Sequence, residues 1–387
     1  MKTRAQRMEF SSPLFFAAIG EKISTLEGQG HDIIRLDIGS PDMPPAEHII
    51  QTLEKDAERE EHHGYQPHHG TQALRRAWAG MYRQRYGVDL DPGQEVLPLL
   101  GSKEGIFHLP LAILDPGDVA LIPDPGYITY TQGTIFAGGT PYYLPLLAEG
   151  DYLPELSAIP GDELRRAKIL WLNYPNNPTA AVAPLEFFAQ AVVFACEYDL
   201  LICHDAAYAQ VSFDGFQPPS LLQVPGAVDV GVEFNTLSKS HNMAGWRVGA
   251  ALGNRQALRS LYTLKTNADS GHFRPVLEAA TAAMSGDQGW LEGRNQVYQQ
   301  RRDLVMQTLR QLGLQASIPK ASLYVWFKTP PGWTSLGFAE MILDRAHVSL
   351  TPGSIFGKYG EGYIRLAFTA PSERVAEAMQ RMTGALS

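Results

Sequence analysis

The sequence predicts an α/β protein, in which a mostly parallel sheet is covered by helices and a smaller α+β domain lies beside it. The chain has 387 residues, more than the roughly 250–300 that one hydrophobic core accommodates, so we expect two domains. Its middle alternates short apolar runs with longer amphipathic stretches, the pattern of parallel strands joined by helices. After about Trp290 the pattern changes to a long helix followed by isolated strands.

Short apolar runs between turn residues mark the strands of the predicted sheet. A helical pattern covers Pro184–Tyr198, and Asp115–Asp118 reads as a turn. The predicted strands are Val96–Leu100, Val119–Ile122, Ile169–Leu172, Leu200–Cys203, Phe234–Leu237 and Val248–Leu252.

A second domain is predicted from the last hundred residues. From about Trp290, apolar residues recur on one helical face, and Gly313 is placed to cap the helix. Strands are expected at Leu323–Lys328 and Tyr363–Phe368. The first 45 residues have no sheet pattern of their own and should pack on this domain. We therefore predict a large domain at 46–285 and a small domain formed by 1–45 and 286–387.

Composition narrows the function. The chain carries 32 basic and 41 acidic residues, a net charge of −9, which disfavours nucleic acid as a partner. The apolar runs are shorter than the roughly 18–20 residues of a membrane span, and the N-terminus lacks a signal-peptide core. The two cysteines, Cys196 and Cys203, suggest no disulfide, and the histidines have no partners at metal-ligand spacing. We expect a cytoplasmic protein without a metal.

Four polar side chains follow four different predicted strands. They are Tyr127, Asn177, Asp205 and Lys239. Ligands of open α/β sheets bind outside the carboxyl ends of the strands, so these residues should share one crevice. A lysine amine can form an imine with an aldehyde, and a carboxylate can keep a pyridine nitrogen protonated. An amide and a phenol can donate to a phenolate oxygen. The set matches the needs of pyridoxal 5′-phosphate (PLP).

Five motifs then carry a family resemblance. They are Ile38–Asp42 (IGSPD), Asn173–Thr179 (NYPNNPT), His204–Tyr208 (HDAAY), Thr236–Gly249 around Lys239, and Tyr363–Leu366 (YIRL). In this order and spacing they resemble the class I and II aminotransferases of PLP fold type I, across nearly the whole chain. The resemblance implies a seven-stranded sheet and transfer of an amino group between an L-amino acid and a 2-oxo acid by a ping-pong mechanism.

The resemblance also implies roles around the cofactor ring. Lys239 would hold PLP as a Schiff base and move the proton, and Asp205 would pair with the ring nitrogen. Tyr208 and Asn177 would contact the ring oxygen, and Tyr127 would stack on the ring. Turns, helix caps or a core tyrosine are the simpler structural interpretations of these residues.

Further residues are implied at the phosphate and at the substrate. Ser102 and Lys103, at the start of a helix, would bind the phosphate with Thr236 and Arg247. Tyr65 begins a Tyr-x₄-Gly-x₃-Leu-Arg pattern and would reach the phosphate of the other subunit in a homodimer, although it could simply cap a turn. Arg365, with Gly39 and Asn177, would bind the substrate α-carboxylate.

Two positions depart from the family pattern. Ala180 stands where glycine is usual, so that loop either has an ordinary backbone conformation or is strained. Thr236 replaces a serine and keeps the hydroxyl. Neither change removes a chemical group.

The substrate and two rival functions stay open. Lys265–Gly271 (KTNADSG) and Lys320–Trp326 are most similar to LL-diaminopimelate or aspartate-like aminotransferases, and Lys265, Arg274 and Lys103 are candidates for a distal cation. A C–S β-lyase would use the same residues. A non-catalytic ligand sensor is disfavoured, because no helix-turn-helix precedes the family sequence. No G-x-G-x-x-G segment suggests NAD.

Overall fold

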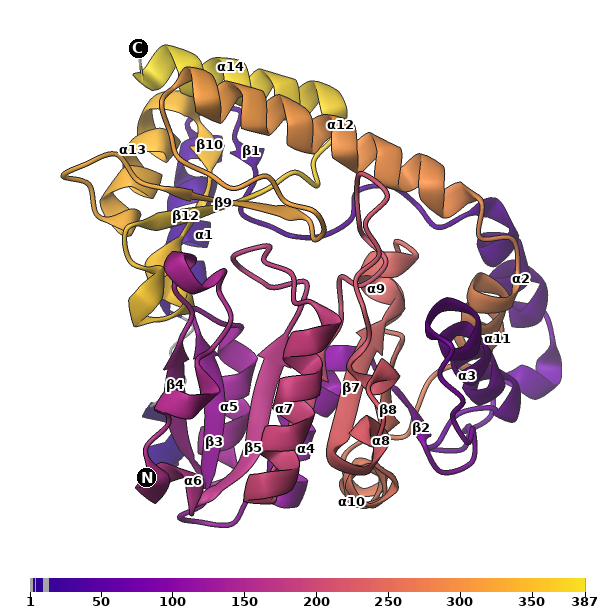
Figure 1. The fold of residues 1–387 in the computed structure, drawn as a ribbon. Helices are drawn as coiled ribbons and strands as arrows, with labels where there is room; N and C mark the ends of the chain where they lie inside the picture. The colour runs from indigo at the N-terminus through magenta and orange to yellow at the C-terminus, as the bar shows by residue number, and fades with distance from the viewer. Residues whose placement is uncertain (1–2, 4, 10–13, 387) are drawn as a thin grey trace.

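The computed structural model describes residues 3, 5–9 and 14–386, and its centre is a seven-stranded sheet (Figure 1). The strand order is β2-β8-β7-β6-β5-β3-β4, and only β8 is antiparallel to its neighbours. The bounds are β2 Val96–Leu99, β3 Val119–Asp124, β4 Thr140–Pro145, β5 Ala167–Asn173, β6 Leu201–Asp205, β7 Gly231–Thr236 and β8 Gly249–Gly253. The predicted fold class is confirmed.

Helices cover both faces of this sheet. Side chains from α4, α5 and α10 pack on one face, and side chains from α3, α7 and α11 on the other. The helices of the large sheet and its flank are α2 Glu47–Ala57, α3 Gln72–Tyr86, α4 Ser102–Ile113, α5 Ile128–Phe136, α6 Gly161–Leu164, α7 Leu185–Tyr198, α8 Ala227–Val230, α9 Leu237–Ser240, α10 Arg255–Ala268 and α11 Arg274–Ser285.

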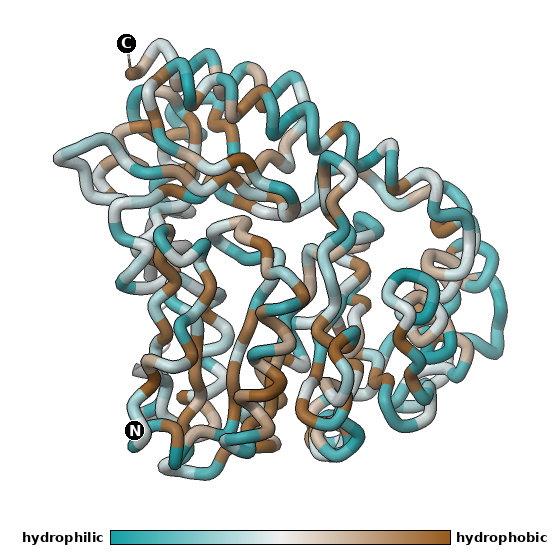
Figure 2. Tube along the Cα trace, in the orientation of Figure 1, coloured by the Kyte–Doolittle hydropathy of each residue, from teal (hydrophilic) through white to brown (hydrophobic). Residues whose placement is uncertain are grey.

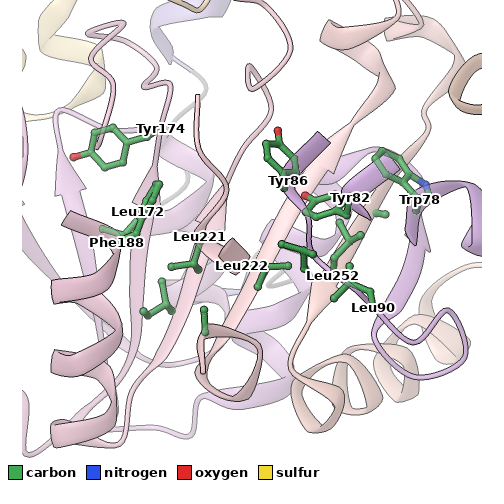
Figure 3. Close-up of a cluster of buried hydrophobic side chains, with 14 of the residues drawn as sticks. Trp78, Tyr82, Tyr86, Leu90, Leu172, Tyr174, Phe188, Leu221, Leu222 and Leu252 are labelled. Carbon is green, nitrogen blue, oxygen red and sulfur yellow. The ribbon is translucent and has the colours of Figure 1, made fainter. Parts of the chain in front are cut away.

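The hydrophobic cores follow from the alternation of side chains along the strands. Phe188 of α7 lies against Leu172 of β5, and Tyr82 of α3 lies near Leu252 of β8 (Figure 3). The strands are hydrophobic over much of their length, whereas α12 alternates hydrophilic and hydrophobic residues (Figure 2). Both faces of the sheet are thus buried, as parallel sheets require.

A second group of elements lies across the carboxyl ends of the strands (Figure 1). It contains a three-stranded antiparallel sheet, β11-β12-β9, and a two-stranded parallel pair, β1 with β10. The bounds are α1 Leu14–Gly28, β1 Ile34–Arg35, α12 Trp290–Gln311, β9 Tyr324–Lys328, α13 Ser335–Ala346, β10 Val348–Ser349, β11 Thr351–Pro352, β12 Tyr363–Ala367 and α14 Ser372–Leu386.

Most sequence predictions for this part are confirmed. The long helix is α12, and Gly313 after it has a φ of 69°, as a capping glycine should. The N-terminal segment, which has no sheet pattern in its sequence, nevertheless contributes the two-residue strand β1, which pairs with β10. Ile34 and Leu36 are buried in the second core with residues of α12, β9 and β12. We propose the domain division 46–285 and 1–45 with 286–387, which these separate cores support.

One strand boundary differs in a way that affects the site. The predicted strand to Leu237 ends at Thr236, because Thr236 caps the short helix α9 by accepting a hydrogen bond from the Ser238 N–H at 3.1 Å. Lys239 therefore lies on α9. Among the described residues, no helix is long and apolar enough to cross a membrane.

Candidate active site

A pocket of about 580 Å³ lies at the carboxyl ends of the strands and is also lined by residues of the second group of elements, among them Arg35, Tyr324 and Arg365. Eleven of the twelve residues predicted to bind the cofactor or the substrate α-carboxylate line it, and they come from eight separated segments of the chain. They are Gly39, Ser102, Lys103, Tyr127, Asn177, Asp205, Tyr208, Thr236, Lys239, Arg247 and Arg365.

Lys239 presents a largely buried amine. Its Nζ donates to the Gly39 carbonyl oxygen at 2.5 Å. Burial lowers the pKa of this amine, and the positive charges of Arg365 and Arg247 lower it further, although Tyr324 and Asp205 oppose them. A lowered pKa raises the fraction of neutral amine, which is the nucleophilic form.

Asp205 is the last residue of β6, and its carboxylate is buried. Tyr130 donates a hydrogen bond to Oδ2 at 2.8 Å, and the Ala207 N–H donates to Oδ1 at 3.2 Å. Burial raises the pKa of Asp205, and these two donors oppose the rise. Tyr130 was not predicted; it is fully buried and stacks on Trp171 with centroids 4.7 Å apart.

Two further tyrosines line the pocket, Tyr208 after β6 and Tyr324 on β9. The hydroxyls of Tyr208 and Tyr324 lie 2.8 Å apart, and burial raises the pKa of Tyr208 well above its usual value. Tyr127, before α5, lines the pocket and meets Tyr130 edge to face at 5.7 Å. Tyr324 was missed because it lies in an apolar strand, β9, whose pattern predicts only core residues.

The phosphate-sized end of the pocket lies at the start of α4. Gly101 is the N-cap, with a φ of 81°, and Ser102 is the first helical residue, so backbone N–H groups are available to an anion. A side chain at Gly101 would clash, because its Cβ would lie 2.2 Å from Nη2 of Arg247. Arg247 is exposed and donates to the Ala244 carbonyl at 2.8 Å. These donors fit a phosphate.

Thr236 has a hydroxyl that is already engaged. Its Oγ1 donates to the Val248 carbonyl at 3.0 Å and accepts from the Ser238 N–H. Ser238 also lines the pocket, with its Oγ 3.5 Å from Nη1 of Arg247. Ser238 is therefore a candidate phosphate donor that the sequence motif did not single out.

Arg365 is a buried guanidinium on β12. It donates to Asn177 Oδ1 at 2.8 Å and to the Asp37 carbonyl at 2.7 Å. Its Cζ lies 4.3 Å from the ring centre of Tyr324 and 4.8 Å from that of Phe356. The two rings fix the plane of a cation that can bind a carboxylate.

Gly39 is held close to that arginine and to the lysine. A Cβ there would lie 2.0 Å from the Tyr324 hydroxyl, so only glycine fits between the two domains. Arg35 and Asp37, which the sequence did not suggest, also line the pocket and form a two-point ion pair, at 2.8 and 2.7 Å.

Some singled-out residues do not line the pocket of this chain. Tyr65 is 93% exposed. Arg274 pairs with Glu278, and Lys265 is buried between Glu104 and Asp269. Of the three candidate distal cations, only Lys103 lines the pocket. Ala180, the departure from the family pattern, has a φ of 58° and so takes the strained alternative.

An amine that can bind an aldehyde, next to a buried carboxylate that can pair with a pyridine nitrogen, is the arrangement of PLP-dependent enzymes of fold type I, and this chain is one of them. The family's sequence model, aminotransferase class I and II, matches residues 31–382, and the chain belongs to that family. It is a PLP-dependent aminotransferase.

Relatives match it over nearly its whole length. It is 50% identical to the LL-diaminopimelate aminotransferase of Desulforudis audaxviator over 99% of this chain and 97% of that protein. Identity to the LL-diaminopimelate aminotransferase of Moorella thermoacetica is 49%, over 98% and 97%. These relatives do not favour the β-lyase or the sensor.

Solved structures share the fold. Substrate-bound BacF from Bacillus subtilis has a TM-score of 0.95 and 35% identity, covering 99% of this chain and 98% of that one. A probable N-succinyldiaminopimelate aminotransferase from Thermus thermophilus has a TM-score of 0.91 and 36% identity, covering 96% and 99%.

Proposed function

We propose that this aminotransferase moves an amino group from LL-diaminopimelate to 2-oxoglutarate. The observation that carries the proposal is the buried Arg365 facing Lys239 in one pocket, in a chain about half identical to relatives named for that substrate. Lys103 also lines this pocket and would serve either the cofactor phosphate or a distal carboxylate, whereas Arg35 is already paired with Asp37.

Three residues would have distinct roles in the reaction. Arg365, fixed by Asn177 and Tyr324, would bind the α-carboxylate. Lys239 Nζ would carry the proton from the Cα of the amino donor to the cofactor and, in the second half-reaction, from the cofactor to the Cα of the former 2-oxo acid. Asp205 would keep the ring nitrogen of PLP protonated. When bound, PLP supplies the aldehyde that receives the amino group and a ring that withdraws electrons from Cα.

Ser102, Lys103, Thr236 and Arg247 would hold the cofactor phosphate. The first helical residues of α4 would supply backbone N–H donors, and Arg247 would supply charge. Tyr127 would stack on the ring, and the Tyr208 hydroxyl and the Asn177 amide would donate to its phenolate oxygen.

A panel of amino donors with 2-oxoglutarate tests the substrate. LL-diaminopimelate should give glutamate with the highest kcat/KM, ahead of aspartate and the meso isomer of diaminopimelate. Aspartate as the preferred donor, with no glutamate formed from LL-diaminopimelate, would reject the substrate but leave the aminotransferase assignment intact. Release of pyruvate and ammonia from cystathionine would reveal a lyase activity.

We also propose a cytoplasmic homodimer with shared active sites. The two cysteines are free, which fits a reducing compartment. The exposed ring of Tyr65 precedes α3 and is available to a second copy of the chain, as the family resemblance implies.

A further inference from the structure

A buried ionic cluster lies behind the phosphate end of the pocket and outside its lining. Its centre is Lys265 of α10, whose side chain is 1% exposed. The Nζ donates to Glu104 Oε1 at 2.9 Å and to both carboxylate oxygens of Asp269 at 2.9 Å. Burying a lysine is costly unless it is fully paired, so this arrangement needs an explanation beyond packing.

One arm of the cluster leads through α4 to Arg247. Glu104 uses its second oxygen, Oε2, to accept the backbone N–H of Leu100. The carbonyl oxygen of Leu100 accepts a hydrogen bond from Nη2 of Arg247 at 3.4 Å. Leu100 directly precedes Gly101 and Ser102, so Glu104 fixes the turn that leads into the first residues of α4, of which Ser102 and Lys103 line the pocket.

The other arm leads through the end of α10 to the same arginine. Asp269 is the C-cap of that helix, and its Oδ1 accepts the N–H of Gly271 at 3.1 Å. The next residue, His272, donates from Nε2 to the backbone carbonyl of Arg247 at 2.7 Å. Arg247 needs such support because its φ of 59° is unfavourable for a residue with a side chain.

Both arms therefore end on one residue, the first on its guanidinium and the second on its carbonyl. We propose that the Lys265–Glu104–Asp269 cluster is a positioning device that holds Arg247 and the Leu100–Ser102 turn in the geometry that binds the cofactor phosphate. The inference rests on the proposed phosphate role of Arg247 and Ser102. It also gives Lys265 a role other than that of a distal substrate cation.

The test compares two ligands that differ at the phosphate. Apoprotein is titrated with PLP and with pyridoxal, which lacks the phosphate, and the Kd of each is measured. Lys265→Met should raise the Kd for PLP roughly tenfold or more, the scale at which outer supporting residues act on a bound group. The Kd for pyridoxal should change less than about threefold, because the ring-binding residues are untouched.

A matched control removes a similar ion pair elsewhere. Arg302 of α12 is 3% exposed, pairs with Asp303 of the same helix and with Asp214, and forms no hydrogen bond or ion pair with Arg247 or the Leu100–Ser102 turn among the described residues. Arg302→Met should lower the Tm of the apoprotein without changing the ratio of the two Kd values. If Lys265→Met does not fold, Glu104→Gln serves instead, since its amide oxygen can still accept from Leu100 while the ionic link to Lys265 is lost.

Parallel loss of PLP and pyridoxal affinity in the folded variant, or no loss of either, would overturn the positioning role. The phosphate role of Arg247 in the proposed function is tested separately. Equal Kd values of wild-type apoprotein for PLP and pyridoxal, or an unchanged ratio of these values in Arg247→Met, would show that Arg247 does not bind the phosphate.

Discussion

At the scale of single residues, burial adjusts the two ionisable groups of the pocket in opposite directions. It lowers the pKa of the Lys239 amine and raises the pKa of the Asp205 carboxyl, so each group is shifted toward its neutral form. The protein keeps Asp205 within reach of ionisation through the hydrogen bond from Tyr130. The neutral Lys239 amine can react with the aldehyde of PLP, and the Asp205 carboxyl can ionise when it pairs with the protonated ring nitrogen.

Replacing Asp205 tests the proposed role of its carboxylate. Asp205→Asn keeps the shape but removes the counter-charge of the ring nitrogen, so kcat should fall by about 10²–10³-fold or more. The raised pKa means that the native apoprotein binds more protons than the unfolded chain just above pH 3.8, so its stability falls as pH rises through that window. Asp205→Asn has no carboxyl to ionise, so its stability does not fall in this way, and the variant should be at least as stable as wild type at pH 7. A kcat within tenfold of wild type would refute the role.

The pH dependence of PLP binding by the apoprotein tests the lowered pKa of Lys239. Because burial lowers the pKa of Lys239, the neutral amine becomes the main form at a pH below the 10.5 of a free lysine. The rate at which apoprotein captures PLP should rise with pH and level off before that value. Stopped-flow absorbance over a pH series measures it, and a midpoint at 10.5 or above would contradict the buried amine.

At the scale of elements, the strands buried on both faces could be predicted because their apolar runs are short and bounded by turns. β4 was missed: it is one of the two edge strands of the sheet, its side chains are mostly exposed or half-buried, and prolines lie at its second and last positions. β1 was missed because two residues carry no pattern. The helix α9 was missed because a hydroxyl cap, not periodicity, defines its start.

The turn between β2 and α4 requires glycine at its φ of 81°. Gly101→Ala places a Cβ against Arg247 at a φ of 81°, so it should weaken PLP binding and lower the free energy of unfolding by about 1–2 kcal/mol. Gly293→Ala is the control, because that exposed position in α12 has no atom within 4 Å and should gain roughly 0.5–1 kcal/mol. Urea titration and PLP binding measure both, and equal behaviour of the two variants would disprove the steric argument.

At the scale of the whole molecule, the pocket exists because two cores meet at the carboxyl ends of the strands. The motif residues could be predicted since each directly follows a predicted strand or matches a family segment. Their supports could not: Tyr324, Phe356, Tyr130 and Asp37 lie in stretches whose patterns indicate only core or turn. Their proximity to Arg365 or Asp205 arises from tertiary packing.

Shared active sites predict complementation between two inactive variants. Tyr65→Ala lacks the group given to the neighbour, and Lys239→Ala lacks the amine of its own site. After mixing, unfolding and refolding together, heterodimers should contain one intact site, and activity should recover to at most about a quarter of the wild-type value by statistical pairing. Tyr65→Ala mixed with itself is the control. A fully active monomer would rule the arrangement out.

The pocket around Lys239 should hold PLP through that amine. Borohydride reduction of the holoprotein, followed by peptide mapping by mass spectrometry, tests this attachment most directly. The reduced cofactor should be fixed on the peptide that contains Lys239, and Lys239→Ala protein should carry no fixed cofactor. Stable attachment at another lysine, such as Lys103 or Lys265, would contradict it.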